Sequence, residues 1–173
     1  MNPIVCLGSG CSVLGTNYPH FFMVQSNMSV PIPEGYKPLD RGGPFLNNLG
    51  PWYCRLDDKG QLVMALRIEE RHTNIRHIAH GGLLASMADT ALGVVLSHAR
   101  TPPQPMVTVS LTTDFIESAR PGDWVEAHVD VIRVGGRLAY GNCFLMVGER
   151  RILRASGVFA LMKPVIPQED SEG

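Results

Sequence analysis

The stretch that decides the fold runs Asn74-Ile-Arg-His-Ile-Ala-His80-Gly81-Gly82-Leu-Leu-Ala-Ser-Met-Ala-Asp89-Thr90-Ala91. A glycine pair after a histidine opens a long, almost wholly apolar pattern, which we expect to continue as one helix to about Ala99. Such a helix must be buried on most sides. Inside it stands one carboxylate, Asp89, and a buried carboxylate with no local cation is costly unless something compensates or uses it. The stretch therefore predicts a central helix that carries a chemically active acid.

Extended segments flank this helix on both sides. Before it, the turn Asp57–Gly60 separates two apolar runs, 51–56 and 61–68, as in a β-hairpin. After it, Pro102 and Pro103 break the helical pattern, and four further extended runs follow at 105–116, 124–133, 138–147 and 151–162. One buried helix with antiparallel strands around it is an α+β fold. A curved antiparallel sheet wrapped around one central α-helix, the hotdog architecture, is one of the α+β arrangements that satisfies the pattern.

Length and composition indicate a single core. The chain has 173 residues, of which 45% are hydrophobic, and its 15 basic and 16 acidic residues give a net charge of −1. The charges form no block of one sign, which argues against a nucleic-acid-binding surface or a polybasic membrane anchor. No segment approaches the ~20 apolar residues of a membrane span.

We expect three regions along the chain. Residues 1–49 form an N-terminal extension rich in Gly and Pro, with a short helix possible within 38–49; residues 50–163 form the main domain; residues 164–173 are a polar tail. The first residues lack the basic start and sustained apolar core of a targeting signal, and Met23 or Met28 are alternative starts. The cysteines Cys6, Cys11, Cys54 and Cys143 are scattered without metal-ligand spacing, which favours reduced thiols, no metal site and a cytoplasmic location.

The geometry of the helix separates its two most reactive side chains. His80 and Asp89 are nine positions apart, so they face opposite ways and lie ~13–14 Å apart along the axis. One copy of the helix therefore does not bring both to one scissile bond. Either only one of them is catalytic, or a site combines Asp89 of one subunit with the helix start of another.

The helix start is a candidate for binding an oxygen that gains negative charge. Its first N–H groups have no intrahelical partner and carry the positive end of the helix dipole, while Gly81 and Gly82 let other atoms approach the backbone closely. This suits polarisation of a carbonyl group, and close packing of the helix start is the alternative. Asp89 in an apolar setting suits a general base or nucleophile, and a buried Asp bonded to a neighbouring loop is the alternative.

The order and spacing of Asn74, His80, Gly81 and Asp89 resemble those of hotdog-fold acyl-CoA thioesterases of the PaaI-like (phenylacetyl-CoA thioesterase-like) branch. The resemblance covers roughly residues 50–162. It implies that hotdog domains pair and that each site lies across their interface. It also implies that the Gly81 N–H points at the thioester oxygen and that Asp89 attacks the thioester carbon or activates water. Asn74 then binds near the thioester or orients its loop, and His80 contacts the carbonyl or holds that loop.

Flanking segments resemble the same family more weakly. Thr108 falls where members often carry Ser or Thr, so its hydroxyl is a candidate for orienting water, against the alternative of an ordinary strand threonine. The segment Phe115-Ile-Glu-Ser-Ala-Arg120-Pro-Gly-Asp123 resembles a family turn with Ser118 in place of the usual Pro. Arg120 and Arg137, in turns, are candidates for contacting CoA phosphate, although a solvated turn cation is the default. His77 departs from a position that is commonly Gly.

These observations predict an acyl-CoA thioesterase that converts an aromatic or short-to-medium acyl-CoA to free acid and CoA. No cofactor is expected, because CoA is part of the substrate. The expected assembly is a homodimer as minimal unit and a homotetramer as a dimer of dimers. Two rivals remain: a non-catalytic acyl-CoA-binding or sensing module, and less so a hotdog hydratase or dehydratase. A sensor does not need a carboxylate at the scissile bond, and a hydratase needs a His/carboxylate pair on one substrate carbon.

Overall fold

The computed structural model describes residues 5–7, 10–12, 31–39 and 43–162. The chain divides into two compact units, Met1–Pro31 and Ile32–Gly173. In the first unit, strands β1 (Val5–Leu7) and β2 (Gly10–Ser12) pair antiparallel. Most of the segment considered for a targeting signal and the polar tail at 164–173 lie outside the described residues.

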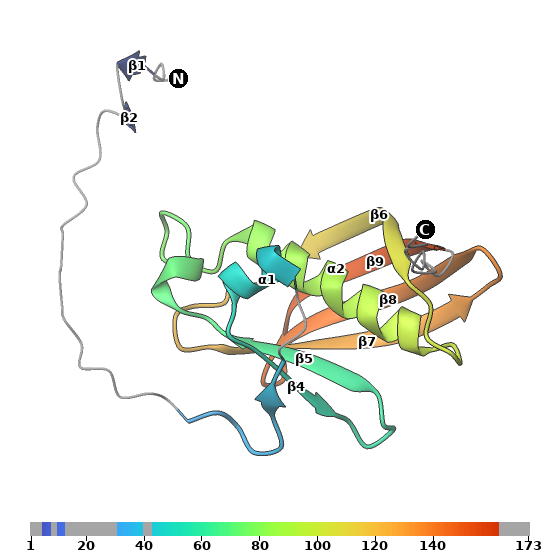
Figure 1. Cartoon of the computed structure of the whole chain (residues 1–173). Helices are drawn as coiled ribbons and strands as arrows, with labels where there is room; N and C mark the ends of the chain where they lie inside the picture. The colour runs from blue at the N-terminus through green and yellow to red at the C-terminus, as the bar shows by residue number, and fades with distance from the viewer. Residues whose placement is uncertain (1–4, 8–9, 13–30, 40–42, 163–173) are drawn as a thin grey trace, which may run out of the picture. The chain divides into compact units, whose positions relative to one another are not determined.

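The second unit is built on a seven-stranded antiparallel sheet with the order β3-β4-β5-β7-β8-β9-β6 (Figure 1). The strands are β3 (Lys37–Pro38), β4 (Trp52–Leu56), β5 (Leu62–Arg67), β6 (Met106–Phe115), β7 (Trp124–Val134), β8 (Leu138–Val147) and β9 (Arg150–Leu161). The helices are α1 (Gly43–Leu49), the 3₁₀ turn η1 (Glu70–His72) and α2 (Gly81–His98). The α+β hotdog fold predicted from the sequence is therefore confirmed, with element ends within one or two residues of the predicted ones.

The compact unit begins earlier than the predicted main domain. Helix α1 packs on the core through Leu46, which is buried, and the Trp52 Nε1 donates to the Leu46 carbonyl at 2.7 Å. Residues 32–49, which the sequence analysis placed in the extension, thus belong to the unit that contains the sheet. The indole hydrogen bond ties α1 to the first long strand.

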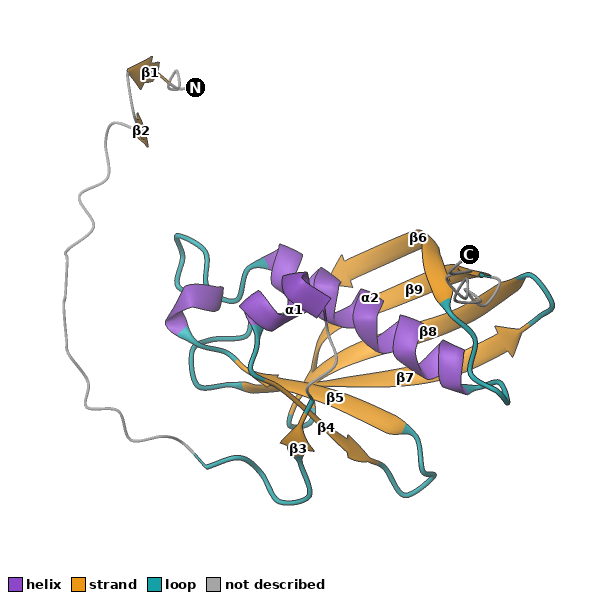
Figure 2. Ribbon diagram, in the orientation of Figure 1, coloured by secondary structure: helices purple, strands orange, loops and turns teal. Residues whose placement is uncertain are grey.

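Helix α2 lies across one face of the sheet, and the strands curve around it (Figure 2). Leu92 sits over two glycines that face each other on neighbouring strands, Gly141 of β8 and Gly157 of β9. A Cβ at Gly157 would lie 2.9 Å from Leu92 Cδ1, and one at Gly141 would lie 3.0 Å from Cδ2. Because neither strand carries a side chain there, the helix approaches the sheet closely and buries its apolar stripe.

One face of α2 remains uncovered, contrary to the expectation of a helix buried on most sides. Its eight buried residues face the sheet, whereas a stripe of mostly small residues is only partly buried: Ala85, Ser86, Asp89, Thr90, Gly93 and Ser97. The expectation that Asp89 is buried is wrong for the single chain, because apolar composition does not show which side of a helix its own sheet covers. Within the described part of the chain, no helix is long and apolar enough to span a membrane.

Candidate active site

His80 caps the start of α2. Its backbone is extended (φ −65°, ψ 131°), and its Nδ1 accepts a hydrogen bond from the Gly82 N–H at 2.9 Å. A Cβ at Gly82 would lie 3.1 Å from this Nδ1, so glycine lets the ring fold back over the helix start. This bond holds the start of the helix, and the contact of His80 with a substrate carbonyl stays a prediction.

The preceding N–H group, that of Gly81, is unused. Among the described residues, no acceptor bonds the Gly81 N–H, which belongs to the first turn of α2. Gly81 is one of the residues that line a pocket of about 360 Å³, here called the Gly81 pocket. The lining residues are Asn74, Ile78, Ala79, Gly81, Leu84, Phe115, Ile116, Glu117 and Ser118. A Cβ at Gly81 would lie 3.2 Å from the Phe115 ring, so glycine allows this aromatic wall to approach the helix start. A free donor inside a largely apolar hollow is suited to a carbonyl oxygen.

Asn74 shapes the loop that leads to this donor. Its Oδ1 accepts from the Arg76 N–H at 2.8 Å, and its carbonyl accepts from the His77 N–H at 2.9 Å. The side-chain Nδ2 has no partner among the described residues, and Asn74 lines the same pocket as Gly81. Asn74 therefore orients the loop and keeps one donor unused.

The backbone of His77 is left-handed. Its φ is +54°, a conformation that favours glycine. Histidine tolerates this conformation better than most side chains. Its Nδ1 also lies 2.8 Å from the Glu70 Oε1, which ties the loop to η1.

Asp89 and Thr108 come together at the uncovered side of α2. The Thr108 hydroxyl donates to the Asp89 Oδ1 at 2.8 Å. Thr108 faces the helix because of a β-bulge: it pairs with Phe159, but Ser110 pairs with the preceding residue Val158, so Val109 is an extra residue. The bulge keeps both Thr108 and the later Leu111 on the helix side of β6. The sequence analysis proposed this hydroxyl for orienting water, and the structure places it against the Asp89 carboxylate.

The donor and the acid are not combined within one protomer. Gly81 and Asp89 are eight positions apart on α2, or ~12 Å along the helix axis. The Gly81 pocket contains neither Asp89 nor Thr108. The described residues thus form two half-sites, a carbonyl-binding half with Asn74 and Gly81 and an acid half with Asp89 and Thr108.

The two predicted CoA contacts are in different places. Arg120 is exposed in the turn that follows Ser118, near the Gly81 pocket, and its N–H donates to Asp123 Oδ2. Arg137 lies at the other end of the sheet, where its carbonyl accepts from the Leu161 N–H at 3.0 Å. Nearby Arg100 at the end of α2 donates to the Gly135 carbonyl. The protomer does not bring Arg137 to the Gly81 pocket.

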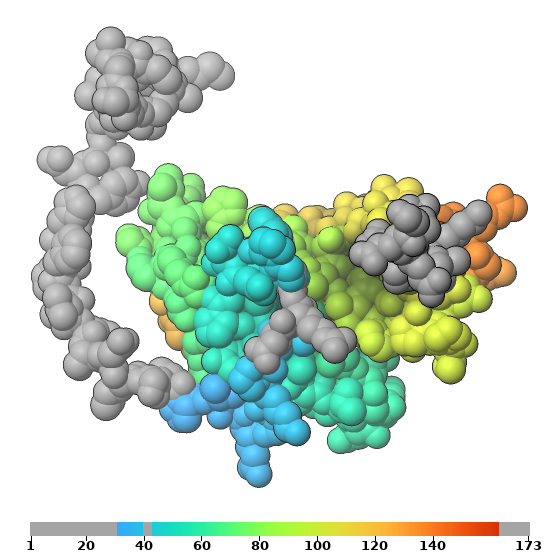
Figure 3. Space-filling model, viewed as in Figure 1, coloured from blue at the N-terminus to red at the C-terminus, as the bar shows by residue number. Residues whose placement is uncertain are grey.

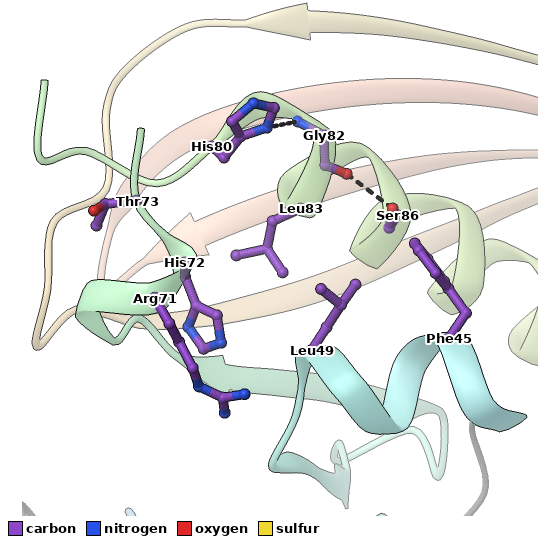
Figure 4. Close-up of a pocket in the computed structure, with 9 residues that line it drawn as sticks. All are labelled: Phe45, Leu49, Arg71, His72, Thr73, His80, Gly82, Leu83 and Ser86. Atoms are coloured by element: carbon purple, nitrogen blue, oxygen red, sulfur yellow. Dashed lines mark hydrogen bonds between the residues drawn. The ribbon is translucent and has the colours of Figure 1, made fainter. Parts of the chain in front are cut away.

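A second pocket, of about 380 Å³, opens on the other side of the same loop. It is lined by Phe45, Leu49, Arg71, His72, Thr73, His80, Gly82, Leu83 and Ser86, and is called here the α1–α2 pocket (Figure 4). The β-bridge between Thr73 and Ala79 closes this loop, which separates the two pockets. Thr73 and His80 line the α1–α2 pocket, and Asn74 and Gly81 line the Gly81 pocket. No motif surrounds His72 in the sequence.

The described residues contain no group of three or more His, Cys, Asp or Glu side chains placed to hold a metal ion. Cys54 and Cys143 are free thiols, and burial raises the pKa of Cys143 to about 12. Such a buried thiol is a poor nucleophile, so neither half-site contains a reactive cysteine.

Comparison with known proteins identifies the family to which the chain belongs. Residues 77–153 match the model of the thioesterase superfamily. The chain is 52% identical over 130 residues to the predicted esterase PA0474 of Pseudomonas aeruginosa, covering 75% of this chain and 97% of that protein. The chain therefore belongs to the thioesterase superfamily.

More distant relatives carry more specific names. Human acyl-coenzyme A thioesterase 13 is 24% identical over 115 residues, which are 66% of this chain and 81% of that protein. A mutant structure of the phenylacetic acid degradation protein PaaI from Thermus thermophilus superposes with a TM-score of 0.60 at 25% identity, covering 69% of this chain and 99% of that one. The predicted membership of the PaaI-like hotdog thioesterases is thereby confirmed.

Proposed function

We propose that the protein is an acyl-CoA thioesterase. The observation that carries the proposal is the unpartnered N–H of Gly81, which lines one pocket together with Asn74, whose Nδ2 is also without a partner among the described residues. The relatives named as an acyl-CoA thioesterase and as PaaI support an acyl-CoA as substrate. The acyl group is taken to be aromatic or short to medium in length.

The two half-sites supply complementary parts of a hydrolysis. The Gly81 N–H binds the thioester oxygen and stabilises the negative charge that it gains when the carbonyl carbon is attacked. Asp89 takes a proton from the attacking water, whose oxygen forms the new C–O bond, and the C–S bond breaks to release CoA as a thiol after it receives a proton. In the alternative route, the Asp89 carboxylate forms a C–O bond to the carbonyl carbon, and the C–S bond breaks so that CoA leaves as a thiolate that takes up a proton. Water then hydrolyses the resulting anhydride, which releases the free acid and restores the Asp89 carboxylate. Thr108 holds the carboxylate by its hydrogen bond in either route.

The separation of the half-sites favours a dimer in which each site uses both chains. Strand β6 is an edge of the sheet, and no other described strand pairs with its outer side. Val107, Val109 and Phe115 on this strand are exposed by 47%, 60% and 55%. A long apolar edge beside an uncovered helix face is typical of an interface. Pairing through this edge would bring the Asp89 face of one chain to the partner chain. The homodimer, the homotetramer, the arginine contacts to CoA and the cytoplasmic location stay predictions.

A thiol-release assay with a panel of acyl-CoA esters tests the proposal. Wild-type protein should release CoA from at least one ester, and the Asp89→Asn variant should not exceed background while still binding the substrate. Binding of acyl-CoA without release by wild-type protein would support the sensing module instead. Hydration of an enoyl-CoA without thiol release would support the hydratase.

A further inference from the structure

Two loops border the Gly81 pocket, and the backbone ties them together. The first loop, residues 74–78, leads to Ala79, and the second loop, residues 116–123, joins β6 to β7. The Ala79 N–H donates to the Ala119 carbonyl at 2.8 Å, so the two loops lie side by side. Both lie at the end of the sheet where β6 ends and β7 begins, and Figure 3 shows the segment of residues 70–80 in green on the surface.

Each of these loops carries one arginine close to the pocket. Arg76 of the first loop is two residues from Asn74, and Arg120 of the second loop is two residues from Ser118; both neighbours line the Gly81 pocket. The two arginines are exposed, and neither guanidinium has a hydrogen bond or an ion pair among the described residues. Their backbone N–H groups, in contrast, are held by Asn74 Oδ1 at 2.8 Å and by Asp123 Oδ2 at 2.9 Å.

The acids of the two loops already have a cation. The loops contain two carboxylates, those of Glu117 and Asp123. Arg150, at the start of β9, donates to Glu117 Oε2 at 3.0 Å, and its second terminal nitrogen lies 3.6 Å from Asp123 Oδ2. Because Arg150 neutralises this pair of acids, the guanidinium groups of Arg76 and Arg120 stay available to an anion from outside the chain.

The substrate of the proposed reaction supplies such an anion. When a thioester carbonyl lies at the Gly81 N–H, the pantetheine arm of CoA leads away from the carbonyl toward the rim of the pocket. At the end of this arm CoA carries a diphosphate and a 3′-phosphate. The planar fork of an arginine matches the oxygen atoms of a phosphate group better than any other side chain does.

We propose that Arg76 and Arg120 together bind the phosphate groups of CoA at the rim of the Gly81 pocket, and that they set the preference for CoA esters over thioesters without a nucleotide. This inference rests on the proposed thioesterase function. It adds Arg76, which no sequence motif marks, and it pairs Arg120 with Arg76 in place of Arg137 at the other end of the sheet.

The test compares phenylacetyl-CoA with phenylacetylpantetheine, which share the acyl group and the thioester but differ in the phosphates and the nucleoside. The full-length protein is used in the thiol-release assay, and another acyl group of the panel replaces phenylacetyl if it is hydrolysed faster. For the wild type we expect kcat/KM to be about 25-fold higher for the CoA ester, since each exposed contact to phosphate contributes up to about fivefold. The difference should be in KM, because the phosphates are remote from the reacting carbon.

Variants then assign the preference to the two arginines. Arg76→Gln and Arg120→Gln should each raise KM for the CoA ester about fivefold, with kcat and the hydrolysis of the pantetheine ester unchanged. The double variant should bring the preference close to one, and Arg76→Lys, which keeps the charge, should retain part of it. Arg133→Gln is the matched control: Arg133 is exposed on β7, nine residues or ~30 Å along the strand from Trp124, and its loss should keep the wild-type preference.

Binding of free CoA gives a second measurement that needs no turnover. Calorimetry should show weaker binding of CoA by the double variant than by the wild type. Added salt should weaken the binding by the wild type and should have much less effect on the double variant, because salt screens exposed charges.

The outcomes separate this inference from the proposed function. A wild type without preference for the CoA ester, or an unchanged preference in the double variant, would overturn the inference and leave the thioesterase in place. A preference that is lost in Arg137→Gln but kept in the double variant would do the same, as would equal losses on both esters, which indicate a structural role of the loops. No thiol release from any acyl-CoA of the panel would overturn the proposed function itself. The calorimetry still tests the arginines in that case, and equal Kd values of wild type and double variant for CoA would count against them.

Discussion

The hydroxyl of Thr108 donates to the Asp89 Oδ1 at 2.8 Å, so a residue of the edge strand holds the only carboxylate of the central helix. Asp89→Asn keeps the shape of this side chain and an oxygen that accepts from Thr108, but it removes the basic carboxylate. We expect kcat to fall ~10²–10⁴-fold, as is typical for loss of a general base. Because Asp89 is only partly buried, thermal stability should hold or rise slightly.

Measuring kcat and thermal unfolding on the same Asp89→Asn preparation decides between roles. A structural aspartate would give the reverse result, with lower stability and normal turnover for each folded molecule. Near-normal kcat would rule out Asp89 as base and as nucleophile.

Thr108 positions the carboxylate of Asp89. The contribution of its hydroxyl to kcat can be separated from the packing of its side chain. Thr108→Val keeps the volume and removes the hydroxyl, so kcat should fall about tenfold, as expected for loss of one hydrogen bond to a charged group. Thr108→Ser restores the hydroxyl and should recover most of the activity. Equal activity in the Val and Ser variants would show that the hydroxyl is not used.

The separation of Gly81 and Asp89 predicts complementation between two inactive variants. Gly81→Val directs a branched side chain at the Phe115 ring and into the carbonyl-binding half, whereas Asp89→Asn damages only the acid half. In a mixed dimer one site combines the intact halves of both chains, so about half of the wild-type activity should return. The measurement uses differently tagged chains purified as the heterodimer. Full activity in a verified monomer, or no recovery in a verified heterodimer, would contradict a shared site.

Sequence reasoning predicted the elements well because each has a local signal. Alternation of apolar and polar residues indicated the strands, and the glycine pair after His80 indicated the helix start. The arrangement of the site depends on non-local features that leave no such signal. The bulge at Val109 turns Thr108 toward α2, and the uncovered helix face leaves Asp89 only partly buried. Neither follows from composition or periodicity, since both depend on which strands and faces the sheet leaves unpaired.

His77 shows the same limit at a single residue. The left-handed backbone of His77 was invisible in the sequence, although the departure from a common glycine marked the position.

The backbone at His77 gives a prediction about stability. In the left-handed region a Cβ costs roughly 1–2 kcal/mol relative to glycine. His77→Ala and His77→Gly both lose the exposed contact to Glu70, which contributes little. We therefore expect the free energy of unfolding of the glycine variant to be about 1 kcal/mol larger than that of the alanine variant in urea titrations. An alanine variant as stable as the glycine variant would show that the loop adopts another conformation.

Glu126 on the outer face of the sheet contributes to the response of the fold to acid. The hydrogen bond from His128 is the main cause that lowers the pKa of Glu126 to about 2, and further contributions come from Tyr36 and Arg55. A depressed carboxyl pKa stabilises the fold above the ordinary value of 4.5, and this stabilisation is lost as pH falls from there toward 2. The free energy of unfolding should therefore decrease across this window in the wild type.

Glu126→Gln removes the titrating group and keeps an amide that can hydrogen bond. At pH 7 it should lower the free energy of unfolding by about 1–2 kcal/mol, the usual contribution of a hydrogen bond to a charged group. Between pH 4.5 and 2 its stability should decline less steeply than that of the wild type, because one fewer proton is taken up on unfolding. Urea titrations at several pH values measure both effects, and Glu149→Gln, on an exposed turn, is the matched control. Parallel pH profiles for wild type and Glu126→Gln would show that the His128 and Tyr36 contacts do not hold Glu126 ionised.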